Sequence, residues 1–198
     1  MNEYGQLIWI QPPNVIISNK IEDYLNKSKT SGLVVWSSKE PITQMTHPSM
    51  FKYFTLKPQD FYFVHMLDTT KMFIVNNPSI HKNLMLPWVK CALKEDCISP
   101  PGAQLNGCDF ARRPEFLYSG CHRYESSSFS IITALLFNFD STQYTPDQNL
   151  PLFLQSINSL LQSTTNDFIS SSIDQKSENN NLLKHKRRKK NLKNKHEK

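Results

Sequence analysis

The residues with the most evident chemistry are four cysteines, grouped in the middle of the chain at Cys91, Cys97, Cys108 and Cys121. Five, ten and twelve residues separate neighbouring cysteines. A structural zinc site usually contains a pair of ligands only about two to four residues apart, and this sequence has no such pair. A single catalytic thiol would not need three companions. The spacing therefore favours two disulfides, with all three pairings open and four buried free thiols as the alternative.

Three of the four cysteines fall in a segment that lacks the periodicity of a helix or strand, and Cys91 stands shortly before it. Residues 97–121 are rich in turn-forming residues, namely Pro100, Pro101, Gly102, Gly107, Pro114 and Gly120. A loop of this length needs either a covalent staple or a function, and a disulfide restricts the unfolded chain of such a segment. Disulfides in turn predict an oxidising compartment.

The sequence carries no evident export signal or membrane span. It opens "MNEYGQLIWIQPPN", without a basic start or a long apolar stretch. No apolar run reaches the roughly 18 residues that a membrane-spanning helix requires. Because this conflicts with the predicted disulfides, we expect that the natural N-terminus lies upstream.

Several polar and aromatic residues near the cysteines are candidates for a site. Arg123 has a planar guanidinium that suits two oxygens of a diphosphate, although such residues more often bridge loops. Asp109 is a candidate general base, with a turn-stabilising role as the alternative. Trp88 and Tyr124 are candidates for stacking on a base or sugar, and core packing is the competing reading. His47 is a candidate substrate-binding residue or simply the start of a helix.

Strand and helix patterns alternate along the chain. Short apolar runs predict strands at residues 5–11, 33–36 and 71–76, the first of them buried. Helical patterns cover residues 18–29, 46–54, 77–96, 126–139 and 149–163. Within them we expect a cap at Ser18 or Asn19, a kink at Pro87 and a serine cap for the helix at 126–139. This order predicts an α/β domain, with two alternatives: a parallel sheet whose first strand begins near residue 5, or a sheet whose earlier strands have been lost.

The chain ends in a polar and then strongly basic tail. Nine of the 23 Lys and Arg residues lie between Lys184 and Lys198, so the rest of the chain is near neutral and slightly acidic. The tail composition predicts disorder for residues 164–198. It lacks the interleaved aromatic residues that stack on single strands, so we do not expect a nucleic-acid partner. An intracellular protein with a nucleic-acid-binding tail is kept as an alternative.

Three longer motifs carry a resemblance to a known family. "LPWVKCALKEDCISPPGAQLNGC", "YSGCHRYESS" and "GLVVWSSKEPITQMTHPSMFKYF" resemble the C-terminal part of a metazoan, nematode-expanded family of membrane-anchored proteins with a glycosyltransferase-like domain. The resemblance covers residues 4–145. It implies a partial, three-layer nucleotide-sugar-transferase-like (GT-A-type) domain at 1–145. The apolar spacing and composition beyond it predict an amphipathic helix at 146–163 and then the tail. The resemblance also implies the lumen of the secretory pathway, such as the Golgi, and a membrane anchor outside this sequence.

The same resemblance bears on activity. It implies a nucleotide-sugar donor, a glycan or protein acceptor, and a divalent cation such as manganese bound after the strand that contains Trp9. Gln11 replaces the acidic residue expected there, which argues against metal-assisted transfer in this chain. The resemblance places His122 against a phosphate or metal, with a loop-bridging hydrogen bond as the alternative. We therefore expect a glycosyltransferase-like protein, active or inactive, with a non-catalytic lumenal glycan- or protein-binding module as the alternative.

Overall fold

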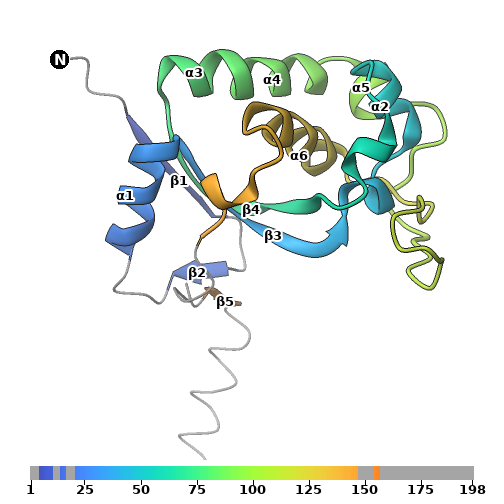
Figure 1. The fold of residues 1–198 in the computed structure, drawn as a ribbon, viewed down its shortest axis with the longest axis horizontal. Helices are drawn as coiled ribbons and strands as arrows, with labels where there is room; N and C mark the ends of the chain where they lie inside the picture. The colour runs from blue at the N-terminus through green and yellow to red at the C-terminus, as the bar shows by residue number, and fades with distance from the viewer. Residues whose placement is uncertain (1–4, 11–13, 17–20, 147–153, 157–198) are drawn as a thin grey trace, which may run out of the picture. The chain divides into compact units, whose positions relative to one another are not determined.

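A computed structural model describes residues 5–10, 14–16, 21–146 and 154–156 (Figure 1). The chain divides into two compact units. The described part of the smaller unit is an antiparallel pair of short strands, β2 (Asn14–Ile16) and β5 (Leu154–Ser156). The larger unit contains all other described residues and every candidate site residue in them. Strand β5 corrects the predicted helix at those three residues, and the rest of that predicted helix lies outside the described part.

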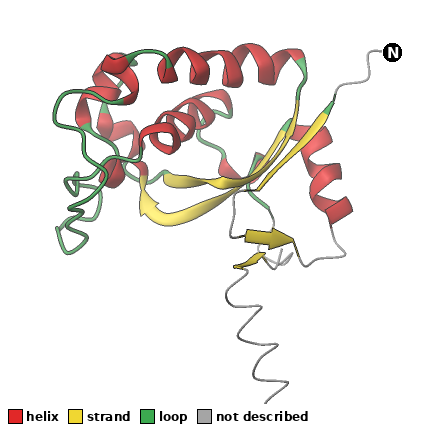
Figure 2. Ribbon diagram, turned by 180° about the vertical axis from the view of Figure 1, so that it is seen from behind, coloured by secondary structure: helices red, strands yellow, loops and turns green. Residues whose placement is uncertain are grey.

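A three-stranded sheet organises the larger unit (Figure 2). Its order is β1 (Gln6–Ile10), β4 (His65–Val75) and β3 (Leu33–Pro41), and both pairings are antiparallel. The predicted mixture of helices and strands is therefore confirmed, but the described sheet is antiparallel where a parallel one was expected. The chain leaves β3 at one end of the sheet and re-enters β4 at that same end, where Pro41 pairs with His65. A parallel pair would have required a crossover to the opposite end.

The segment between β3 and β4 consists of three short helical pieces. They are η1 (Ile42–Met45), α2 (Pro48–Tyr53) and η2 (Pro58–Phe61). Pro48 lies in the first turn of α2, where its missing N–H leaves no helical hydrogen bond unmade. Phe51 and Phe61 from this segment are fully buried, so the connection forms part of the core rather than a surface loop.

Helix α1 (Ile21–Ser31) covers one face of the sheet. Tyr24 packs on Phe73 and Trp36 of the sheet, with Ile21 and Leu25 against the same cluster, as the apolar spacing predicted. The predicted cap residues lie outside the described part. Gly32 ends the helix with φ at 86°, and a Cβ there would come within 2.4 Å of the Ile80 side chain. Both conditions favour glycine.

The opposite face carries helix α6 (Tyr124–Leu136) and a helical run above it (Figure 1). The run comprises α3 (Pro78–Ile80), the π-helical segment His81–Met85 and α4 (Leu86–Ala92), followed by α5 (Glu95–Ile98). Pro87 lies in the first turn of α4, directly after the π-helical segment, which places an irregularity where the kink was expected. The residue that precedes α6 at the cap position is Arg123 rather than a serine, and its side chain makes no capping hydrogen bond. The Ser127 hydroxyl of the helix instead accepts from the backbone N–H of Arg123 at 3.3 Å.

The main core lies between this helical layer and the sheet. Its members are all buried apolar side chains: Leu33, Val35, Leu67, Met72, Ile74, Ile80, Leu84, Phe129, Ile132, Phe137 and Tyr144. Strand β1 is less covered, since Leu7 is 52 % and Trp9 46 % exposed, which corrects the expected burial of this strand. The reason is that both helical layers pack on β3 and β4. Within the described ranges, no helix combines the length and apolarity needed to cross a membrane.

Candidate functional site

The four cysteines form two disulfides, as predicted, and the structure decides their pairing. Cys91 bonds to Cys97 and Cys108 bonds to Cys121. The first bond joins α4 to α5 inside the core, beside Phe51. The second closes the stretch from 108 to 121, which is called the stapled loop below. The second bond therefore lies within the irregular region that the sequence identified as needing a staple, and the first ties the start of that region to α4.

His122 lies directly after the stapled loop and is completely buried. Its Nε2 is 3.1 Å from the carbonyl oxygen of Ile98 and must donate, because a carbonyl only accepts. Nδ1 then accepts from the backbone N–H of His47 at 3.2 Å and lies 3.3 Å from the Ser127 hydroxyl. These four residues, called the His122 junction below, join α2, α5 and α6.

The electrostatics of the junction keep His122 uncharged. Burial is the main reason that the pKa of His122 is lowered to about 4. The hydrogen bond to Ile98 raises the pKa by a smaller amount, and the neighbouring His47 lowers it slightly further. The ring is therefore neutral at physiological pH, and both of its nitrogens have partners. This geometry favours the loop-bridging role of His122 over contact with a phosphate or a metal.

His47 is the residue that precedes α2, as expected for a helix-start residue. Its Nδ1 accepts from the backbone N–H of Ser49 at 3.3 Å, and its ring packs edge-on against Tyr118 with centroids 5.5 Å apart. Burial lowers the pKa of His47 as well. The side chain thus caps a helix and supports the stapled loop.

The other candidate residues near the start of α6 are also held by the fold. The Arg123 guanidinium lies 4.0 Å from the Cys108 sulfur, which places it against the stapled loop. The Tyr124 ring packs against His122 with centroids 5.0 Å apart. Trp88 donates from Nε1 to the Glu125 carbonyl at 3.1 Å and packs edge-on against a core phenylalanine. The structure thus gathers these side chains around the start of α6 as packing and bridging residues.

Asp109 belongs to a turn of the stapled loop. Its Oδ1 accepts from the backbone N–H of Ala111 at 3.1 Å, and its own N–H donates to the Ser119 carbonyl at 2.8 Å. The residue is exposed and its contacts stay within the loop. The turn-stabilising alternative describes this arrangement, and the structure does not show Asp109 paired with His122 as an acid and base.

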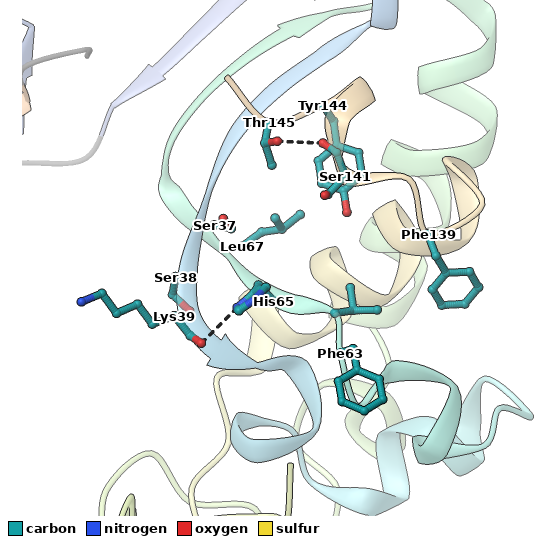
Figure 3. A pocket seen from close by; sticks show the side chains of 11 residues that line it. Ser37, Ser38, Lys39, Phe63, His65, Leu67, Phe139, Ser141, Tyr144 and Thr145 are labelled. Atoms are coloured by element: carbon teal, nitrogen blue, oxygen red, sulfur yellow. Dashed lines mark hydrogen bonds between the residues drawn. The ribbon is translucent and has the colours of Figure 1, made fainter. Parts of the chain in front are cut away.

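A hollow that the sequence did not indicate lies where β3, the start of β4 and the segment after α6 meet (Figure 3). Its volume is about 350 Å³, near the lower end of the range typical of ligand pockets. It is called the Phe63 hollow below, and its lining residues are Ser37, Ser38, Lys39, Phe63, Val64, His65, Leu67, Phe139, Ser141, Tyr144 and Thr145. They come from β3, from β4 with the two residues before it, and from the segment after α6.

The lining of the Phe63 hollow combines exposed rings with small hydroxyl groups. Phe63 is 89 % exposed, although its neighbour Phe61 is fully buried. His65 donates from Nδ1 to the Lys39 carbonyl at 3.0 Å, so its Nε2 is the ring nitrogen left for a ligand. The Thr145 hydroxyl donates to the Ser141 carbonyl at 2.8 Å (Figure 3). The side chain of Lys39 extends away from the hollow in the same view.

The sequence offered only a weak signal for this site. Phe63 stands in the run "DFYFVH", which has the composition of a core segment. The serines and Thr145 come from two segments that are distant in sequence, so only the fold brings them together.

We also looked for a possible metal site and for similar proteins. In the part of the chain that the structure describes, no group of three His, Cys, Asp or Glu residues is placed to hold a metal ion. Gln11 lies outside that part. Comparison with protein families, with curated proteins and with solved structures gave no match. The resemblance to a glycosyltransferase-like family therefore stays a hypothesis from the sequence motifs.

Proposed function

We propose that this protein is a non-catalytic saccharide-binding module of glycosyltransferase-like lineage that works in an oxidising compartment. The observation that carries the proposal is the Phe63 hollow, where a strongly exposed aromatic ring adjoins a cluster of hydroxyl groups. A sugar has apolar C–H faces that pack on an aromatic ring and hydroxyls that both donate and accept hydrogen bonds. Serine, threonine and histidine side chains supply the matching donors and acceptors.

The state of the candidate catalytic residues supports binding over transfer. A general acid or base requires a group that can reach the substrate and a pKa suited to proton exchange. His122 is buried, with both ring nitrogens engaged, and Asp109 stabilises its own turn. In addition, a nucleotide-sugar donor would be expected to bind at the carboxyl ends of parallel strands. The described three-stranded sheet is antiparallel and does not offer such an edge.

The two disulfides support the proposed compartment. Cys91, Cys97 and Cys121 are fully buried, and each bond links segments that the fold must hold together. Structural disulfides of this kind are typical of the secretory pathway and the extracellular space. A lumenal location also agrees with the family resemblance.

Saccharide titration tests the proposal. Saturation-transfer NMR and calorimetry would use glucose, mannose, galactose and N-acetylglucosamine with their short oligomers, and UDP-sugars with and without manganese. We expect binding of at least one saccharide series without added metal. Phe63→Ala should lower that affinity about tenfold, roughly 1.4 kcal/mol, because the stacking surface is removed.

Phe110→Ala is the matched control, since Phe110 is also exposed but does not line the hollow. Its affinity should equal that of the unmodified protein. Absence of binding to every saccharide would refute the proposal. Manganese-dependent binding of a UDP-sugar that is insensitive to Phe63→Ala would instead support the transferase reading.

A further inference from the structure

A second hollow adjoins the first and shares part of its wall. It has a volume of about 500 Å³ and is lined by Lys39, Pro41, Tyr62, Phe63, His65, Arg113, Pro114, Glu115 and Phe116. Lys39, Phe63 and His65 line both hollows. The exposed Phe63 ring therefore lies at the boundary between the two hollows and is accessible from each of them.

The far wall of the second hollow is built from the stapled loop. Phe116 of this loop stacks on Tyr62, with ring centroids 4.0 Å apart and planes inclined by 16°. Arg113 and Glu115 form an ion pair at 3.6 Å in which the side chains are 63 % and 68 % exposed. Such an exposed pair contributes little to stability. Because both side chains are largely exposed, their hydrogen-bond donors and acceptors are accessible to a ligand.

The stapled loop is held by bonds within it and by a bond to the body of the domain. The Cys108–Cys121 bond closes it, and the Ser119 hydroxyl donates to the Gln44 carbonyl at 2.7 Å. Arg112 donates across the loop to the Tyr118 carbonyl at 2.6 Å. A wall held in this way loses little conformational entropy when a ligand binds, which favours affinity.

We infer that the two hollows are adjacent subsites for a linear oligosaccharide that crosses the boundary formed by Phe63 and His65. This inference rests on the proposed saccharide-binding function and adds the length of the ligand. One sugar unit lies in the Phe63 hollow among hydroxyl groups. The next unit lies in the second hollow, where Tyr62 and Phe116 offer aromatic surface and Arg113 and Glu115 offer a donor and an acceptor.

Dependence of affinity on ligand length tests the inference. Calorimetry would compare N-acetylglucosamine with chito-oligosaccharides of two to six units, and mannose or glucose with their corresponding oligomers. We expect the affinity to rise by about tenfold between the monosaccharide and the disaccharide, and then to level off. Two sites joined in one ligand act together because the second contact is intramolecular.

Variants of the second hollow assign that gain to its residues. Phe116→Ala should abolish the gain for the oligosaccharide while the monosaccharide affinity stays unchanged. Glu115→Gln is a milder variant that keeps the Tyr62–Phe116 stack, and it should reduce the gain in the same selective way. Thr145→Val, in the first hollow, should weaken monosaccharide and oligosaccharide alike. Disulfide mapping and thermal unfolding would confirm that each variant is folded.

The outcomes separate the inference from the proposed function. Monosaccharide binding that is lost with Phe63→Ala, without any gain from longer ligands, would overturn the two-subsite inference and leave the proposed function standing. A gain with length that survives both Phe116→Ala and Glu115→Gln would also overturn it. Failure of every saccharide to bind would remove the proposed function, and the inference with it.

Discussion

The His122 junction and the Phe63 hollow use similar residue types for opposite purposes. In the junction a histidine and a serine are buried, and their polar atoms are satisfied by backbone groups and by each other. In the hollow His65 and Ser141 are exposed, and the ring of His65 has only Nδ1 tied to the backbone. The difference teaches that residue type alone does not mark a site. What matters is whether the fold has already used the hydrogen-bonding capacity of the side chain.

The comparison also explains why the stapled loop serves both regions. Its disulfide lies against the junction, where Cys121 precedes His122, while Phe116 at its tip forms the wall of the second hollow. A loop that is anchored at its base can present exposed residues at its tip without unfolding. The junction therefore holds the base of the loop whose Phe116 lines the second hollow.

Removing the disulfides should have a large effect on both stability and binding. Chain-entropy arguments give a loss of about 2 kcal/mol for the Cys91–Cys97 bond and about 3 kcal/mol for the longer Cys108–Cys121 loop. Urea unfolding of Cys91→Ala/Cys97→Ala and Cys108→Ala/Cys121→Ala would measure these losses. The second pair should also abolish the gain in affinity for longer saccharides. Alkylation and intact mass of the unmodified protein should find no free thiol, and four free thiols in folded protein would contradict the structure.

The next effect concerns the junction itself. His122→Leu removes a donor and an acceptor from a buried site, which leaves the Ile98 carbonyl and the His47 N–H without partners. Each unsatisfied buried group costs about 1–3 kcal/mol, so we expect a total loss of about 3 kcal/mol in the free energy of unfolding. His81→Leu is the control, since His81 is exposed. Equal stability of the two variants would show that the junction is not a structural unit.

Acid should weaken the junction selectively. His122 has a pKa of about 4 when folded and an ordinary value near 6.5 when unfolded, so the unfolded chain binds the extra proton first. The contribution of neutral His122 to the free energy of unfolding is fully present above about pH 6.5. It decreases as the pH falls toward 4, where the total loss approaches about 3 kcal/mol. His47, whose pKa burial also lowers, acts in the same direction. Urea titrations between pH 7 and 4 would measure the slope.

The variant His122→Asn provides the comparison for this pH series. Its side chain can accept from the His47 N–H but does not titrate in this range. The slope should therefore become shallower than in the unmodified protein. An unchanged slope would assign the acid sensitivity to other groups and would contradict the role given to His122.

The smallest expected effect on stability falls on the hollow. Phe63 is almost fully exposed, so Phe63→Ala should change the free energy of unfolding by no more than about 0.5 kcal/mol. Phe61→Ala, two residues away and fully buried against Phe51, should cost about 3–5 kcal/mol. Chemical unfolding of the two variants side by side measures the contrast. A large loss for Phe63→Ala would mean that this ring serves packing rather than binding.

Features set by interactions between residues close in sequence were predicted well, and features set by distant residues were not. Helix α1 was predictable because the apolar stripe of Ile21, Tyr24 and Leu25 is a local pattern. The direction of the strands was not, because it depends on where the chain goes between β3 and β4 rather than on any strand residue. The predicted helix across Leu154–Ser156 was wrong for a related reason, since these residues pair with a strand more than a hundred positions earlier.

The sequence by itself favoured two disulfides, because four cysteines cluster in and just before an irregular, proline- and glycine-rich segment that lacks the close ligand pair of a zinc site. It also determined the α/β class and the place of α2 behind His47, because capping and periodicity act over a few residues. Only the tertiary structure decided the disulfide pairing, the antiparallel sheet and the satisfied state of His122. It alone assembled the Phe63 hollow, because β3, β4 and the segment after α6 meet only in the folded chain. Exposure and hydrogen-bond satisfaction are properties of that folded surface, and a linear sequence does not contain them.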